Sequence, residues 1–240
     1  MAVTVQSVVD RVQKTLQDTT GVRWPVVDEL VLWVNDAQRE IALLKPDSSA
    51  KNTTVTLAPG TKQEIPNDGN RLLRVVRNMS AATNGLGKRA VRIVSREVLD
   101  AQTPDWHDPT VSGDAAHVLT VKHYVYDEQN PRNFYVYPGV ASSGGSAFVE
   151  IIYSANPSTV AQNGNLDIPD IFANAVMNYV LYMAYMKDAE YAGNNQRAAS
   201  HFQLFMSSIT GKGQVDALTS PNYSSNSVPR VPQISAPPVG

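Results

Sequence analysis

The stretch WPVVDELVLWVNDAQREIALLKPD, residues 24–47, decides the fold of the first part of the chain. Pro25 stands where a helix can begin without needing its N–H, and Pro46 stops the helix. Trp33 and Leu43 lie off the main apolar face, so this helix is expected to touch two neighbours. Apolar residues recur with helical spacing at Val27, Leu30, Val31, Val34, Ala37, Ile41 and Leu44.

Three further segments are predicted to be helical. A first helix runs from Val5 to Leu16 and ends before the turn at residues 19–21. Residues 171–186 are apolar nearly all round, which predicts a buried helix. A last helix is expected to close at Gly211 and Gly213, with an apolar face made of Ala198, Phe202, Phe205 and Ile209.

The middle of the chain is rich in β-branched and aromatic residues, with Gly, Asn and Pro turns between the runs. Residues 95–102 are expected to form a short helix. Strands are predicted at residues 53–57, 72–79, 90–94, 118–126, 134–137 and 147–153. Because no long helix separates them, an antiparallel sheet or sandwich is expected.

The predicted fold class is α+β: a helical bundle, with two N-terminal and two C-terminal helices, and a central antiparallel β-sheet or sandwich domain. The N-terminal helices occupy residues 1–50, the β-rich domain 51–165, and the C-terminal helices 166–213. An extended Pro/Ser-rich arm, residues 214–240, completes the chain.

Composition excludes several functions. The net charge of -2 argues against a dedicated nucleic-acid binder, and the absence of cysteine removes disulfides and thiolate metal sites. Charged residues make up only 18% of the chain, which suggests that much of the surface faces other protein. The start of the chain lacks the pattern of a signal peptide, and residues 171–186 are too short to cross a membrane.

No residues have the spacing of a catalytic or metal site, so we expect no enzyme activity, metal or cofactor. Asp105, His107 and Asp108 offer three ligands in four residues, but we favour a polar loop around a half-buried Trp106. The glycines around Lys88 and Lys212 are interpreted as turns rather than phosphate loops.

Seven basic residues without an intervening acid lie between positions 71 and 96. They are Arg71, Arg74, Arg77, Lys88, Arg89, Arg92 and Arg96. Such a basic hairpin could contact DNA phosphates, dock on an acidic rim of a partner ring, or form a solvated face. The sequence leaves these three interpretations open.

The arm cannot build a core of its own, so order in it would require a partner. Pairing of its main chain with the edge of a neighbour's sheet would help to hold it. Its candidate partner-binding residues are Tyr223, Val228, Arg230, Val231 and Ile234.

Several segments, in order, resemble the head-to-tail adaptor (connector) family of tailed bacteriophages. They are WPVVDEL (24–30), WVNDAQREI (33–41), KPD (45–47), NFYVYP (133–138), YSANP (153–157), IPD (168–170), YVLY (179–182) and KDAEY (187–191). Residues 71–96 and the arm do not contribute to the likeness.

The resemblance implies a structural virion protein. Such adaptors form a ring, commonly of about twelve copies, below the portal. The ring extends the DNA channel through which packaged DNA passes, and it docks tail nozzle or tail fibre proteins. A C-terminal arm reaches the portal in several members, and a neighbouring subunit could cover the apolar helix at 171–186. The expected location is the head–tail junction of the virion, after assembly in the host cytoplasm and with no membrane contact.

The alternative is another tail component, a tail-completion or fibre-docking subunit that does not touch the portal. A third hypothesis is a wall-degrading enzyme.

Overall fold

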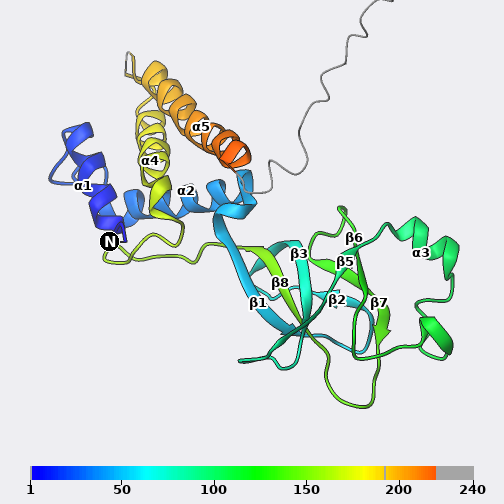
Figure 1. Ribbon diagram of the computed structural model, residues 1–240. Coiled ribbons are helices and arrows are strands. Elements are labelled where there is room, and N and C mark those ends of the chain that lie inside the picture. The colour runs from blue at the N-terminus through cyan, green and yellow to red at the C-terminus, as the bar shows by residue number, and fades with distance from the viewer. Residues whose placement is uncertain (1, 192, 220–240) are drawn as a thin grey trace, which may run out of the picture.

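The computed structural model describes residues 2–191 and 193–219, and it divides into a helical unit and a β unit (Figure 1). The helices at both ends of the chain come together, while the middle of the chain forms two sheets. The predicted α+β class, with helices at both ends and a central β domain, is confirmed, and of the two predicted arrangements, sheet or sandwich, the structure has two sheets. The candidate partner-binding residues of the arm, from Tyr223 to Ile234, lie outside the described residues.

The helical unit contains α1 (Val5–Leu16), a π-helical turn (Val26–Leu30), α2 (Val31–Leu44), α4 (Ala173–Lys187) and α5 (Asn194–Thr219). Short 3₁₀ turns at Pro46–Ser49 and Asp170–Phe172 adjoin α2 and α4. The Thr4 hydroxyl begins α1 by accepting a hydrogen bond from the Ser7 N–H at 3.1 Å.

The π turn explains one departure from the predicted apolar face of α2. A π turn has more residues per turn than an α-helix, so residues within it, such as Val27, fall on a different side from the one that α-helical spacing predicts. Val27 is therefore 62% exposed, whereas Leu30, Val34 and Ile41 are fully buried. Trp33 packs against the helical core while partly exposed, and Leu43 lies on the other side of α2 and is 72% exposed.

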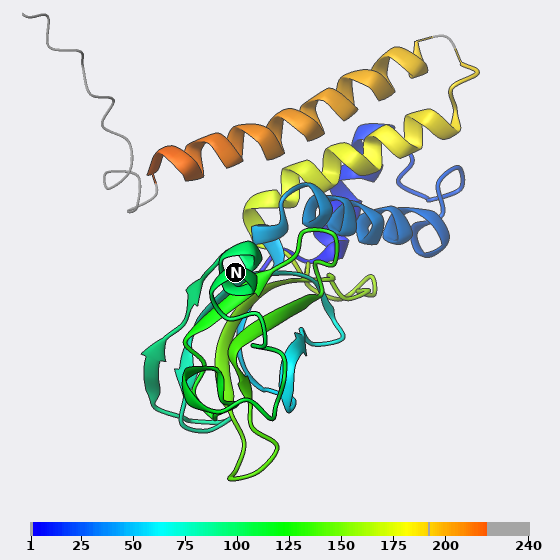
Figure 2. The same cartoon turned by 90° about the vertical axis from the view of Figure 1, so that its right-hand side faces the viewer.

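α4 is the central helix of the unit, and the chain's own helices cover it. It packs against α1, α2 and α5, and Figure 2 shows α4 and α5 running side by side. Val176, Val180, Leu181 and Ala184 of α4 are buried, while Met177, Tyr179 and Tyr185 are partly buried. Most of the cover that the sequence led us to expect is therefore supplied within one subunit.

The sequence predicted that the last helix closes at Gly211 and Gly213. Instead, α5 continues to Thr219. Glycine weakens a helix because its backbone loses more conformational freedom on folding than that of any other residue. Here Lys45, next to the C-terminal end of α2, lies with its Nζ 3.0 Å from the Asp216 Oδ2. Lys212 also pairs with Asp216, so a tertiary ion-pair cluster holds the last turns of α5.

The β unit is a sandwich of two four-stranded sheets, ordered β1-β8-β3-β4 and β2-β7-β6-β5. The strands are β1 (Ala50–Thr56), β2 (Gly60–Glu64), β3 (Gly69–Met79), β4 (Gly87–Ala90), β5 (Arg92–Ile93), β6 (His123–Tyr126), β7 (Asn133–Val140) and β8 (Phe148–Ala155). All pairs are antiparallel except β5 with β6, which is parallel. The expected helix at 95–102 is present as α3 (Arg96–Gln102), and a 3₁₀ turn follows at Gly113–Ala115.

Three predicted strand features were wrong. The run 90–94 is two strands, because the buried Val91 marks the point where the chain passes from one sheet to the other. Only residues 123–126 of the run 118–126 form a regular strand. β2 was missed because Thr61 and Gln63, its buried residues, are polar; the Gln63 amide bonds to Ala58 and Gly60 and closes the turn before it.

Candidate functional site

β3 places three of the predicted basic residues on one exposed side. Its pairing with β8 shifts at three bulges, each of which adds one residue to β3. In a regular strand every second side chain is buried, but in β3 every third side chain is buried. The buried residues include Leu72, Val75 and Asn78. Arg71, Arg74 and Arg77 are exposed in the same repeat.

The three arginines differ in how far they are already paired. Arg77 Nε lies 2.6 Å from Glu150 Oε2. Arg71 makes only a 3.5 Å contact with the Tyr126 hydroxyl, and Arg74 has no ion pair or hydrogen bond from its side chain within the described part of the chain. Arg96 is also engaged, since it lies 3.5 Å from Asp100 and stacks over the ring of Tyr135.

A second basic group surrounds His123. Arg89 follows Lys88 on β4, and Arg92 on β5 pairs in register with His123 on β6. Burial lowers the pKa of His123, and the positive charges of Arg89, Arg92 and Lys122 lower it further. We call Arg74, Lys88, Arg89, Arg92 and Lys122 the basic surface; they are cations without an ion-pair partner among the residues that the structure describes.

Lys122 was missed from the sequence. It lies far along the chain from Arg92, and only the parallel pairing of β5 with β6 brings the two strands together. Parallel neighbours carry no local turn signal, so nothing in the sequence places Lys122 near Arg92.

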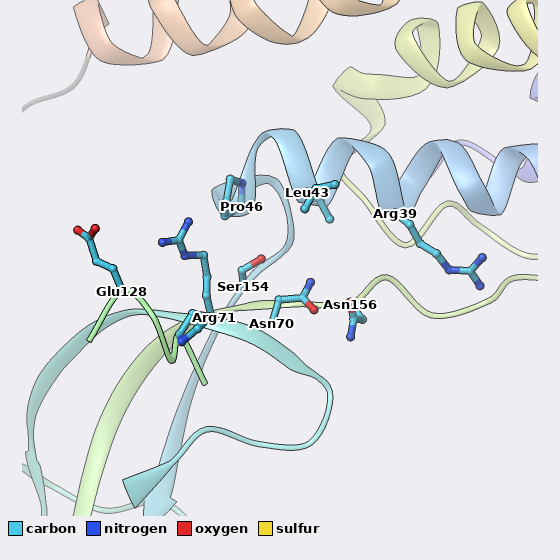
Figure 3. Close-up of a pocket in the computed structure, with 10 residues that line it drawn as sticks. Arg39, Leu43, Pro46, Asn70, Arg71, Glu128, Ser154 and Asn156 are labelled. Atoms are coloured by element: carbon cyan, nitrogen blue, oxygen red, sulfur yellow. The ribbon is translucent and has the colours of Figure 1, made fainter. Parts of the chain in front are cut away.

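A groove of about 500 Å³ lies between the two units (Figure 3). α2 and the turn after it supply one wall, with Arg39, Leu43 and Pro46, and Leu43 points into the space between the units. The β unit supplies the other wall, where the labelled residues are Asn70, Arg71, Glu128, Ser154 and Asn156. Of these residues only Arg71 was a candidate contact residue in the sequence, and Leu43 was noted only as lying off the apolar face of its helix. The groove itself exists only once the units meet.

The polar loop around Trp106 has a structural role. Trp106 is fully buried rather than half-buried, and its Nε1 donates to Asp100 Oδ1 at 2.8 Å. The His107 ring lies against Trp106, tilted by 31°, and its Nδ1 lies 2.7 Å from the Thr61 hydroxyl. Burial lowers the pKa of His107, with Arg96 adding to the effect. No group of three or more metal-ligating side chains occurs in residues 2–191 and 193–219.

The candidate sites of this protein are therefore two surfaces suited to contacts, the basic surface and the groove between the helical unit and the β unit. A family model described as SU10 adaptor protein matches residues 3–228, which is nearly the whole chain. The chain therefore belongs to the SU10 adaptor protein family, and it is a structural adaptor of a bacteriophage virion; the family is one of structural proteins rather than enzymes. A search of curated proteins found no match. Among the helices of the described residues, none is long and apolar enough to span a membrane.

Proposed function

We propose that this chain forms a ring at the head–tail junction, below the portal, and that the ring extends the DNA channel and docks the tail. The observation that carries the proposal is the family match over residues 3–228. The match includes the helical unit, the β unit and the first part of the arm, so it applies to the molecule as a whole rather than to one motif.

In the proposal the helical unit and the arm make different contacts. The helical unit packs subunits side by side into a ring, commonly of about twelve copies, by a heterologous contact that closes on itself. The arm, with Tyr223, Val228, Arg230, Val231 and Ile234, reaches the portal. Tail nozzle or tail fibre proteins dock on the opposite side.

The decisive experiment mixes the purified protein with portal rings and images the product. A second ring stacked on the portal supports the proposal, and no co-assembly across a range of salt concentrations contradicts it. A chain ending at Thr219 is the matched variant, because it keeps every described element and removes the proposed portal contact.

The alternative is a tail-completion or fibre-docking subunit that does not touch the portal. Cross-linking from residues 221–240 in whole virions separates the two functions. Links to the portal support the ring below it, and links only to tail proteins favour the alternative.

For the basic surface we propose contact with an acidic rim of a neighbouring virion protein. Support comes from Arg74, Lys88, Arg89 and Arg92, which are exposed and lack ion-pair partners in the described part of the chain. Arg71 and Arg77, also candidates from the sequence, are partly engaged already. Changing Arg89 and Arg92 to Gln should weaken assembly most at low salt, because surface charge is screened by ions. A loss of duplex DNA binding instead, with assembly unchanged, would assign the surface to packaged DNA.

A further inference from the structure

The groove between the units carries polar groups that the described chain leaves unpaired. The side-chain amides of Asn70 and Asn156 and the carboxylate of Glu128 have no hydrogen-bond or ion-pair partner in residues 2–191 and 193–219. Leu43, 72% exposed, adds an apolar wall beside Pro46. The groove thus combines amide donors, one unpaired carboxylate, the guanidinium groups of Arg39 and Arg71 and an apolar strip.

We propose that this groove binds residues 228–234 of the same chain before the subunit joins its partner. This proposal rests on the proposed function in one respect: the arm leaves the groove when it binds the portal. The arm segment reads VPRVPQI, and it is the occupant that the following observations favour.

The position where the described chain ends supports this occupant. Asp216, three residues before Thr219, is joined to Lys45 at 3.0 Å, and Lys45 directly precedes Pro46 in the groove wall. Figure 1 shows the last turns of α5 above the C-terminal end of α2. The nine residues from Thr219 to Val228 can span about 30 Å when extended.

The spacing of the segment fits the chemistry of the groove. Val228, Val231 and Ile234 recur at every third residue, which is one edge of a polyproline II helix. That edge matches the apolar strip of Leu43 and Pro46. A polyproline II chain makes no internal hydrogen bonds, so its carbonyls remain free to accept from Asn70 and Asn156.

Charge supports one register of the segment in the groove. Arg230 is the only charged side chain in residues 220–240, and Glu128 is the carboxylate in the groove wall. In the proposed complex the Arg230 guanidinium donates to Glu128. The tether favours the chain's own groove over a neighbour's, because a short flexible link gives an effective concentration of about a millimolar or more.

The test uses cysteine pairs in the isolated full-length subunit, because the chain has no cysteine of its own. Leu43→Cys with Val231→Cys should form a disulfide within one chain under mild oxidation. Leu204→Cys with Val231→Cys is the control, since Leu204 is 51% exposed on α5 and outside the groove. Links that form equally in both pairs, only between chains, or not at all would overturn the proposal.

A charge exchange tests the register. Glu128→Lys should lower the linked fraction by about threefold, as expected for one exposed ion pair. Adding Arg230→Glu should restore it, while Glu97→Lys, an exposed change on α3, should have no effect. A linked fraction indifferent to Glu128→Lys would overturn the pairing. Because no portal is present, the result is independent of whether the portal proposal succeeds.

Discussion

Asn78 joins three backbone groups from two segments of the β unit. Its side chain donates to the carbonyls of Arg89 and Val121 and accepts from the Val121 N–H, all at 2.8–2.9 Å, and it is 2% exposed. Asn78→Leu would leave these groups buried and unpaired, so we expect a loss of about 3 kcal/mol in the free energy of unfolding. Urea denaturation measures this, with Asn52→Ala as the exposed control; equal losses in both variants would contradict the role of Asn78.

The two tryptophans Trp106 and Trp33 should differ in their contribution to stability. Trp106 is fully buried and hydrogen-bonded, so Trp106→Ala should cost about 4 kcal/mol. Trp33 is only partly buried against the helical core, so Trp33→Ala should cost roughly half as much. Thermal or urea unfolding of both variants gives the comparison, and a larger cost at Trp33 would reverse this ranking.

His123 should make stability depend on pH. Burial and nearby cations lower its pKa in the folded chain, so the unfolded chain binds the proton at higher pH. The free energy of unfolding should then fall as pH drops through about 6.5, the ordinary histidine value. His123→Gln should reduce that fall, measured by urea titrations at pH about 7.5 and about 5.5. An identical pH dependence in the variant would contradict a lowered pKa of His123 in the folded chain.

At the scale of elements, the end of α5 depends on both glycines and Lys45. A Cβ at Gly211 or Gly213 would meet no atom within 4 Å, so alanine fits at both positions. Each change to Ala should stabilise the local helix by about 1 kcal/mol and slow amide exchange in residues 212–219. Lys45→Met should speed that exchange, while Lys62→Met, an exposed lysine on β2, should not. Slower exchange in Lys45→Met would refute the ion-pair anchor.

The loop from β8 back to α4 is fixed to α2 by buried amides. Asn35 accepts from the Val160 N–H at 2.8 Å, and Gln38 accepts from the Asp167 N–H at 2.7 Å. Both side chains are buried, so these bonds are shielded from water and hold the β unit against the helical unit. The walls of the groove are positioned by this connection.

At the scale of the molecule, the boundary of the arm can be tested by truncation. A chain ending at Thr219 should keep its melting temperature within a few degrees, because it retains every described element. A chain ending at Gly213 loses Asp216 and its link to Lys45, so it should melt lower, by about 2–4 °C per kcal/mol lost. Differential scanning calorimetry distinguishes the two, and equal melting temperatures would mean that residues 214–219 add nothing to the fold.

The sequence by itself determined the class of the fold and the position of most elements. Helical spacing in α1, α2, α4 and α5 and the β-rich runs of the middle are local patterns, and burial of one face fixes them. It also held the order of segments that resembles phage adaptors, which the family match over residues 3–228 supports.

Tertiary structure alone decided the rest. The length of α5 depends on Lys45, and the passage of the chain between sheets at Val91 depends on both sheets being present. The basic surface gains Lys122 through a parallel strand pair, and the groove requires α2 to meet the β unit. Each of these depends on contacts between residues distant along the chain, and periodicity within a segment carries no information about such contacts.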